Sequence, residues 1–385
     1  MADMETSLLH WTEQGTERSA RWHSEAGMPP PKRVVVADDT LNADTAYRLA
    51  CEGTALLWRG DFQNARQLLQ ALARRAEGKQ GKPKKKAAKA PATPTEAFHL
   101  HRQAQSQRAR TLAMLLIPFE PGYTIPLRRA PEVKLACNEA YGRGEDAFVI
   151  SLRELLGVIG AHEWRRTGVE IPALDARIHP HYGVFSPVRG EYVQLVAETP
   201  LPKKTTVAFD IGAGTGVLSA VLAKRGVPHV VATDTDRRAL SCARDNFARL
   251  DLDEQVELLE ADLFPPGRAP LVVCNPPWLP ARPSSSIENA LYDLDSRMLK
   301  GFLAGLKDHL TEDGEGWLIL SDLAEHLGLR PREQLLEWIA QAGLVVLGRQ
   351  DVRPTHPKAS DAEDPLHAAR AAEVTSLWRL GAART

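Results

Sequence analysis

The sequence predicts an α/β fold: a doubly wound, mostly parallel sheet of seven strands in the carboxyl-terminal half, preceded by a mainly helical N-terminal region. From Thr205 onward, short apolar runs alternate with segments of helical periodicity, which is the pattern of a parallel sheet covered by helices. The last apolar run, Glu373–Leu380, follows no segment long enough to return the chain for a parallel pairing. We therefore expect the seventh strand to be antiparallel.

The 385 residues suffice for more than one domain, and changes in composition divide the chain into segments. The N-terminal part is expected to hold a polar flexible tail, a helical hairpin, a linker rich in Lys and Pro, and a helical substrate region, at residues 1–30, 31–77, 78–95 and 96–200. Residues 201–385 are expected to form the ligand-binding domain.

The N-terminal helices are predicted from apolar periodicity. Residues 42–58 place apolar side chains near helical spacing, and Asp61 is positioned to cap a second helix whose leucines share one face. Two longer helices are predicted at residues 96–117 and 147–166.

The carboxyl-terminal elements follow in alternation. Strand-forming runs lie within residues 205–211, 229–236, 256–264, 269–274, 314–322 and 344–352. Helical segments lie within residues 217–226, 237–252, 296–310 and 331–343. Because ligands bind at the carboxyl ends of parallel strands, residues just after these strands are candidates for a shared site.

Composition and charge exclude several classes of protein. The formal net charge of −1 at pH 7 gives the chain no overall bias toward nucleic acid or a membrane surface. No apolar run approaches the roughly 20 residues of a membrane span, so we expect a cytoplasmic protein with no membrane partner. The cysteines lack metal-ligand spacing, and His179 and His181 have no third ligand near them in sequence. No metal is expected.

A glycine turn follows the first strand of the predicted sheet, at Gly212, Gly214 and Gly216. Glycine permits tight backbone geometry and close approach of a ligand, although these glycines alone also fit a purely structural turn. A nicotinamide-dependent oxidoreductase would carry a glycine at the sixth position of the turn, where this chain has Val217. Asp210, just ahead of the turn, suits a ligand with a cationic or hydroxyl-bearing portion.

Three further strand ends carry residues of ligand-binding type. Asp234 lies about 20 residues beyond the glycines, where a carboxylate can accept hydrogen bonds from both ribose hydroxyls. After the third strand, Asp262 is placed to accept from an adenine amino group, with Leu263 or Phe264 packed on the ring. The fourth strand runs into Asn-Pro-Pro-Trp at residues 275–278, and its two prolines make a rigid exit.

With these residues, the sequence resembles the class I S-adenosylmethionine-dependent methyltransferases over residues 184–380, and in particular the members with an Asn-Pro-Pro-aromatic motif. Such enzymes have a Rossmann-like fold and methylate planar nitrogens: the exocyclic amine of adenine or guanine, or the side-chain amide of glutamine. The resemblance implies that S-adenosylmethionine is the cofactor. It places the methionine part on the glycine turn, the ribose on Asp234 and the adenine beside Asp262, with Asn275 also bordering the cofactor.

The motif has a chemical rationale for this reaction. The lone pair of an amide or aryl-amine nitrogen is delocalised, so acceptors for both N–H bonds must stabilise the charge that develops during attack. Asn275 supplies its side-chain oxygen, and Pro276 supplies its backbone carbonyl. Pro277 adds rigidity, and Trp278 stacks on the planar group. We expect these four residues to be catalytic.

The stretch ahead of the cofactor domain bears on the substrate. Residues 184–196 resemble the segment that closes over cofactor and target in the release-factor glutamine methyltransferases, the HemK family. Phe185 and Arg189, together with Trp278, are therefore expected to contact the substrate. This tryptophan stands where that family usually has tyrosine, and the N-terminal region is longer than the family's small helical domain.

Two substrate classes stay open. The resemblance slightly favours a glutamine in a translation protein. A base in ribosomal RNA, or in DNA, is the alternative, since small-domain ribosomal RNA methyltransferases share the core motif. The lysine-rich linker and Arg102, Arg108 and Arg110 would then contact phosphates. A non-catalytic binding module is a third hypothesis, because a fold alone does not establish activity.

Overall fold

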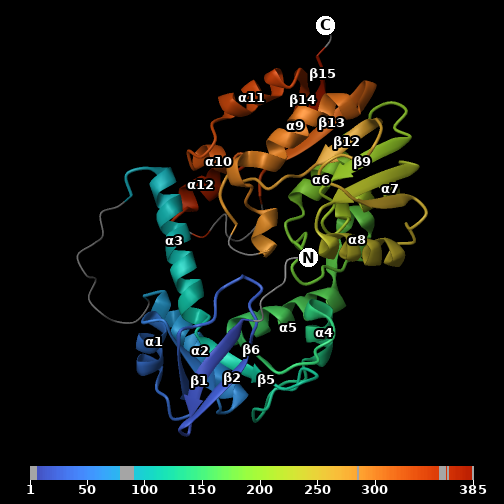
Figure 1. Ribbon diagram of the computed structural model, residues 1–385. Helices are drawn as coiled ribbons and strands as arrows, with labels where there is room; N and C mark the ends of the chain where they lie inside the picture. Colours follow the sequence, from blue (N-terminus) through green and yellow to red (C-terminus); the bar gives the residue numbers. More distant parts are fainter. Residues whose placement is uncertain (1–6, 79–90, 284–285, 355–360, 362–363, 384–385) are drawn as a thin grey trace. The chain divides into compact units, whose positions relative to one another are not determined.

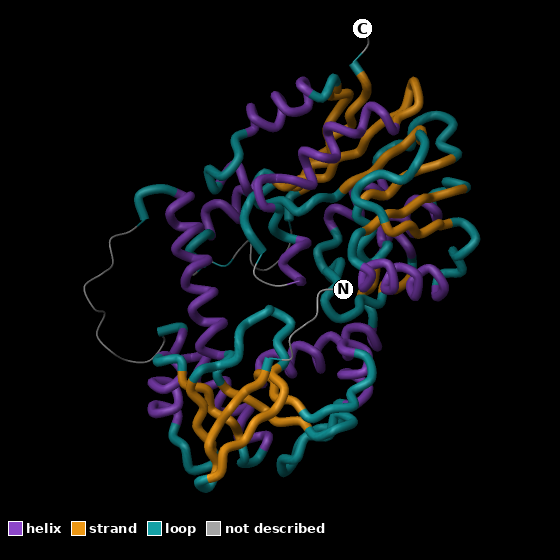
Figure 2. Tube along the Cα trace, in the orientation of Figure 1, coloured by secondary structure: helices purple, strands orange, loops and turns teal. Residues whose placement is uncertain are grey.

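The computed structural model describes residues 7–78, 91–283, 286–354, 361 and 364–383. The chain divides into two compact units. The first comprises Met1–Pro91 and His99–Glu163, and the second comprises Ala92–Phe98 and Trp164–Thr385. Each unit contains a β-sheet with helices packed on it (Figures 1 and 2).

A seven-stranded sheet forms the centre of the second unit, in the order β11-β10-β9-β12-β13-β15-β14. Its strands are β9 (Val207–Ile211), β10 (His229–Asp234), β11 (Val256–Glu260), β12 (Ala269–Cys274), β13 (Leu310–Ser321), β14 (Leu344–Val352) and β15 (Thr375–Ala382). β15 runs antiparallel to both of its neighbours, and the other adjacent pairs are parallel. The predicted Rossmann-like sheet with an antiparallel last strand is confirmed.

Helices cover both faces of this sheet. One face packs against α6 (Glu191–Glu198), α7 (Val217–Lys224) and α8 (Arg237–Arg249), and the other against α9 (Arg297–His309) and α11 (Arg332–Gln341) (Figure 1). Along β12, Leu271 and Val273 join the first core, whereas Val272 and Cys274 join the second. Burial on both faces explains why these strands read as continuous apolar runs.

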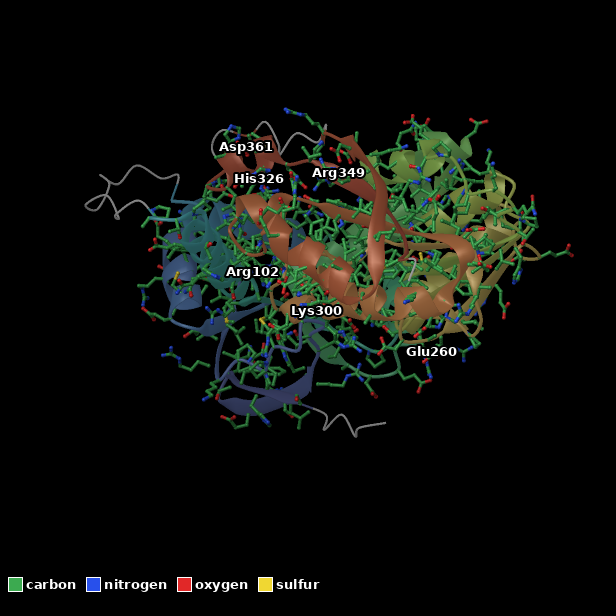
Figure 3. The ribbon with its side chains drawn as sticks, turned by 90° about the horizontal axis from the view of Figure 1, so that it is seen from above. Arg102, Glu260, Lys300, His326, Arg349 and Asp361 are labelled. Atoms are coloured by element: carbon green, nitrogen blue, oxygen red, sulfur yellow. The ribbon has the colours of Figure 1, made fainter. Side chains whose placement is uncertain are left out.

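Two cation–π contacts connect neighbouring elements at the outside of the unit. Lys300 Nζ of α9 lies 4.7 Å from the centre of the Trp338 ring on α11. The guanidinium carbon of Arg349 on β14 lies 5.0 Å from the centre of the Trp378 ring on β15. Figure 3 labels both cations.

The second unit begins earlier than the predicted boundary at residue 201. Residues 164–200 belong to it, and they include β7 (Val169–Ile171), η1 (Pro172–Leu174), β8 (Ala176–Ile178) and α6. Four α6 side chains are buried in the core under the sheet: Tyr192, Val193, Leu195 and Val196. The predicted boundary was too late because it was based on the alternation of strands and helices after Thr205. The sequence did not indicate that α6 packs against the sheet.

The first unit contains a six-stranded mixed sheet in the order β1-β2-β6-β5-β4-β3. The strands are β1 (Leu8–Glu13), β2 (Thr16–Trp22), β3 (Arg33–Ala37), β4 (Thr54–Trp58), β5 (Leu115–Phe119) and β6 (Phe148–Ser151). The accompanying helices are α1 (Ala43–Cys51), α2 (Phe62–Ala76), most of α3 (Pro94–Leu112), α4 (Lys134–Tyr141) and most of α5 (Leu152–Thr167). The prediction of a mainly helical N-terminal region is wrong.

The missed strands have two physical explanations. β4, β5 and β6 are short, fully buried apolar runs, and such runs fit a buried helix or a buried strand equally well by pattern. Within the expected flexible tail, β1 and β2 form a hairpin, and Gln14 and Gly15 both have positive φ in its two-residue turn. The turn residue Gln14 is not a typical hairpin signal.

The lysine run of the expected linker, residues 79–90, lies outside the described residues, so the linker and its contact with RNA stay predictions. Of the arginines predicted to contact phosphates, Arg108 pairs with Glu77 at 2.5 Å, and Arg110 donates to Gln107 at 3.2 Å. Within the described part of the chain, no helix is both long enough and apolar enough to span a membrane.

The start of α3 is part of the second unit. Phe98 is 2% exposed and packs in a small core with residues of α10 (Leu323–His326) and α12 (His367–Ala372). Thr95 Oγ1 donates to the Leu327 carbonyl at 2.8 Å. Residues 92–98 therefore complete a fold whose other residues begin at Trp164.

Replacing Phe98 with alanine should destabilise the second unit by about 3–5 kcal/mol, because it leaves a cavity in that core. Urea denaturation measures the loss. Leu100→Ala is the matched control, since Leu100 is 47% exposed two residues later, and it should change stability by less than about 0.5 kcal/mol. Equal effects of the two substitutions would show that residues 92–98 do not stabilise the unit.

Candidate active site

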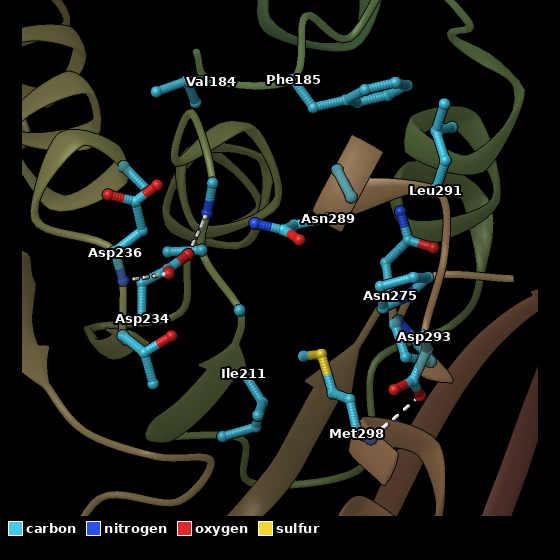
Figure 4. A pocket seen from close by; sticks show the side chains of 18 of the residues that line it. Val184, Phe185, Ile211, Asp234, Asp236, Asn275, Asn289, Leu291, Asp293 and Met298 are labelled. Carbon is cyan, nitrogen blue, oxygen red and sulfur yellow. Dashed lines mark hydrogen bonds between the residues drawn. The ribbon is translucent and has the colours of Figure 1, made fainter. Parts of the chain in front are cut away.

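A cavity of about 620 Å³ lies at the carboxyl edge of the seven-stranded sheet, within the size range of small-molecule sites. Most predicted site residues line it: Phe185, Arg189, Gly212, Gly214, Asp234, Asp262, Leu263, Asn275, Pro276, Pro277 and Trp278. In Figure 4, Asp234 and Asp236 lie on one side of the cavity, and Asn275, Leu291 and Asp293 lie on the other. Asp210 and Gly216, also predicted, do not line it.

The glycine turn forms part of the wall. Gly212 and Gly214 both have positive φ, which glycine adopts without strain. The turn is tied to β10, because the N–H groups of Gly212 and Ala213 both donate to the Thr233 carbonyl, at 2.9 and 2.8 Å. A side chain at Gly214 would meet no atom within 4 Å, so the backbone there faces open space that a ligand can approach.

Asp234 has its carboxylate fixed at the end of β10. Its Oδ2 accepts from the Gly214 N–H at 3.0 Å, and its Oδ1 accepts from the Asp236 N–H at 2.9 Å (Figure 4). Burial raises the pKa of Asp234 above its ordinary value, and the two backbone donors oppose that shift. Each oxygen keeps a lone pair for a further donor, so the carboxylate fits a pair of ribose hydroxyls.

Two residues expected at the cofactor have internal contacts instead. Asp210 is 1% exposed and accepts from Ser219 Oγ at 2.5 Å, and burial raises its pKa to about 6. Gly216 precedes α7 with a φ of +80°, and a Cβ there would lie 2.6 Å from the Phe247 ring. Both residues therefore pack inside the protein against the turn, and neither forms part of the cavity surface.

Asp262 and Leu263 border the cavity beyond the third strand. The Asp262 carboxylate is largely exposed and pairs with Arg297 Nη2 at 2.6 Å. Leu263 has a φ of +75°, and its carbonyl accepts from the Thr233 hydroxyl. The predicted adenine acceptor is therefore already engaged by a cation that lines the same cavity.

The motif at residues 275–278 leaves β12 beside the glycine turn, because Cys274 is the register partner of Ile211. Asn275 Oδ1 accepts from Trp278 Nε1 at 2.9 Å. The Arg189 guanidinium carbon lies 5.5 Å from the centre of the Trp278 ring. Asn275, Arg189 and the aromatic ring are thus joined at one side of the cavity.

Several wall residues were not predicted from the sequence. Asp293 is buried, and its Oδ2 accepts from the N–H groups of Met298 and Leu299 at 2.9 and 3.2 Å, at the start of α9. Met298 reaches back toward the turn, with its Cε 2.7 Å from a Cβ built on Gly212. The connecting segment includes η2 (Ser286–Ala290) and η3 (Leu294–Ser296) and has no periodicity that would have marked it.

The two histidines that the sequence analysis considered as metal ligands, His179 and His181, have other partners. His181 Nε2 lies 2.9 Å from Asp245 Oδ2, and His179 Nδ1 lies 2.7 Å from the Arg165 carbonyl. The described residues contain no group of three or more His, Cys, Asp or Glu that could hold a metal ion.

Comparison with known proteins places this site among methyltransferases. The family described as Methyltransferase small domain matches residues 175–337. A protein from Methanocaldococcus jannaschii named as an N5-glutamine methyltransferase is 28% identical over 163 residues, which cover 40% of this chain and 80% of the relative. The tRNA1(Val) (adenine(37)-N6)-methyltransferase of Shewanella amazonensis is 30% identical over 170 residues, covering 40% and 72%.

Two further likenesses are more limited. A release factor glutamine methyltransferase from Cereibacter sphaeroides is 36% identical over 87 residues, which span 22% of this chain and only 31% of the relative. The crystal structure of a ribosomal protein L11 methylase from Lactobacillus delbrueckii subsp. bulgaricus covers 55% of this chain and 87% of that protein, with 18% identity and a TM-score of 0.38.

Asp234→Ala should weaken S-adenosylmethionine binding about tenfold to hundredfold, because hydrogen bonds to a charged group contribute about 1.5–3 kcal/mol. Isothermal titration calorimetry on the folded variant measures this. Glu260→Gln is the matched control: Glu260 is the register partner of Asp234 on β11, but its carboxylate pairs with Arg237 at 3.1 Å. Unchanged affinity in the Asp234 variant would exclude the ribose assignment.

Asp210 should make stability depend on pH. Its folded pKa of about 6 exceeds the ordinary value of 3.8, so the folded state holds a proton between those values that the unfolded state has lost. Stability therefore falls as pH rises from about 4 to 6, by roughly 3 kcal/mol for a two-unit shift. Asp210→Asn should gain that amount relative to wild type between pH 4 and 7 in urea denaturation. A difference independent of pH would contradict the assignment.

Proposed function

Because the chain belongs to the methyltransferase small-domain family, we propose that this S-adenosylmethionine-dependent methyltransferase methylates the side-chain amide nitrogen of a glutamine in a protein. Members of this family with known acceptors include N-methyltransferases, and this chain is an N-methyltransferase of the same family. The choice of glutamine is the proposal, and a translation factor is the expected kind of acceptor.

The observation that carries the proposal is the position of Asn275 and Pro276 beside the glycine turn. When bound, S-adenosylmethionine supplies an electrophilic methyl group. Gly212, Gly214 and Asp234 would hold the cofactor at the ends of β9 and β10. Asn275 and Pro276 directly follow the adjacent strand, β12, so their oxygens would meet an NH2 group next to the cofactor.

The role of these oxygens is to make a poor nucleophile reactive. An amide nitrogen shares its lone pair with the carbonyl group, and positive charge develops on it as it attacks. The Asn275 Oδ1 and the Pro276 carbonyl would accept one N–H each and stabilise that charge. The two prolines hold both acceptors in place before the substrate arrives, so little reorganisation is needed.

Two features support glutamine as the acceptor. Phe185 and Arg189 come from the segment resembling that of the release-factor enzymes, and both line the cavity. The relative from Methanocaldococcus jannaschii, whose match to this chain spans 80% of its own length, is named as an N5-glutamine methyltransferase. A nucleic-acid base is the second candidate. The relative from Shewanella amazonensis, whose match to this chain spans 72% of its own length, is named as a tRNA adenine N6-methyltransferase.

The two candidates are separated by incubating the enzyme with S-adenosylmethionine carrying a tritiated methyl group and an extract of cells lacking the enzyme. Protease and nuclease treatments then show which polymer carries the label. We expect protease-sensitive label. Nuclease-sensitive label would replace glutamine by a base, and label in neither polymer would contradict both.

Asn275→Ala should reduce methyl transfer by about 10²–10³, by analogy with the loss of one preorganised hydrogen-bonding group. S-adenosylmethionine should still bind within about threefold of wild type, because its main contacts are expected on β9 and β10. Asn275→Asp keeps an acceptor oxygen and should retain partial activity. Initial rates with the labelled cofactor and calorimetric titration measure the two properties. Near-normal transfer by the alanine variant would refute the role of the motif.

A further inference from the structure

We propose that Trp278 is a positioning residue whose indole N–H fixes the orientation of the Asn275 side-chain amide. The geometry is direct: Nε1 donates to Asn275 Oδ1 at 2.9 Å. An indole nitrogen can only donate, so it selects the oxygen end of the amide and disfavours a flipped orientation. The inference rests on the proposed function in one respect, namely that Asn275 Oδ1 accepts from the target nitrogen.

The hydrogen bond from Trp278 leaves Asn275 Oδ1 able to accept a second hydrogen bond from the substrate. A carbonyl oxygen has two lone pairs, so one can hold the indole hydrogen while the other accepts from the substrate. Tyrosine or phenylalanine at position 278 would have no N–H on the corresponding ring edge. The tryptophan at this position therefore supplies a contact that these two side chains could not make.

The indole ring is itself held by residues distant in sequence. Arg189 lies over it with the guanidinium carbon 5.5 Å from the ring centre. Glu373 is 3% exposed, and its Oε1 lies 3.2 Å from Arg189 Nη2 and accepts from Ser321 Oγ at 2.7 Å. A buried carboxylate thus fixes the cation, and the cation restrains the ring.

The backbone of Trp278 is held as well. Arg330 is 4% exposed and donates from Nη2 to the Trp278 carbonyl at 3.3 Å. Its Nη1 donates to Ser296 Oγ, also at 3.3 Å. With both ring and backbone restrained, the indole N–H has a defined direction, and the amide of Asn275 takes its orientation from it.

Trp278→Phe tests the inference because it keeps an aromatic ring under Arg189 and removes the N–H. Using tritiated S-adenosylmethionine and the protein fraction of the cell extract, we expect a rate about tenfold lower, with cofactor affinity within twofold. Trp338→Phe is the control: that tryptophan also lies under a cation, Lys300, but lines no part of the cavity, and its rate should not change. An unchanged Trp278→Phe rate, or an equal loss of cofactor affinity, would overturn the inference.

Making Trp278→Phe in the Asn275→Asp variant distinguishes an amide-orienting role of Trp278 from general structural support. A carboxylate has two equivalent oxygens, so its orientation needs no such donor. In the Asn275→Asp background, Trp278→Phe should therefore cost less than about threefold. A full tenfold loss there would overturn the amide-orienting role.

The hydrogen bond can also be observed without any acceptor. In protein labelled with 15N-tryptophan, the Nε1–H resonance of Trp278 is assigned by its absence in Trp278→Phe. Asn275→Ala should move this resonance upfield in the proton dimension and speed its exchange with solvent, and an unaffected resonance would overturn the inference. Because this readout needs no methyl transfer, it would hold even if label failed to appear in protein and the glutamine assignment were lost.

Discussion

The parallel pairing of β9 with β10 and β12 is the constraint on which the site depends. Ile211 is the register partner of both Thr233 and Cys274, so the glycine turn after β9, Asp234 at the end of β10 and Asn275 after β12 lie at the same edge of the sheet. Apolar side chains from these strands are buried on both faces of the sheet, and a one-residue slip would exchange the faces. The core that specifies the register therefore also sets the distance from the glycine turn and Asp234 to the motif at residues 275–278.

The charged residues near the site differ in position: one carboxyl group is buried inside the protein, and the others lie at or next to the cavity. Asp210 lies inside the turn with Ser219, and burial raises its pKa to about 6. Asp234 lies one strand away at the cavity, where two backbone N–H groups hold it. On the opposite side, Arg189 and Arg330 restrain Trp278. The cavity thus has a carboxylate on one side and, on the other, the Asn275 amide hydrogen-bonded to a tryptophan that two cations contact.

The sequence predicted the second unit well because its evidence was redundant. Apolar runs, intervening helices and strand-end residues all indicated one topology, and most predicted site residues line the cavity. The first unit offered only short apolar runs such as Thr54–Trp58, whose pattern fits either element. Arg330 and Glu373 could not be predicted, since their roles arise from packing between distant segments. Asp210 was misplaced because sequence position does not reveal whether a side chain points inward.

In the proposed reaction, Asn275 and Trp278 present a planar NH2 group to the methyl donor. The most direct measurement is fragment-ion mass spectrometry of an acceptor methylated by the enzyme, which locates the methyl group to a single atom. We expect it on the side-chain amide nitrogen of a glutamine. A methyl group on the exocyclic amine of a base would retain the planar nitrogen and overturn the choice of glutamine. A methyl group on oxygen, sulfur or a tetrahedral amine would contradict the account as a whole.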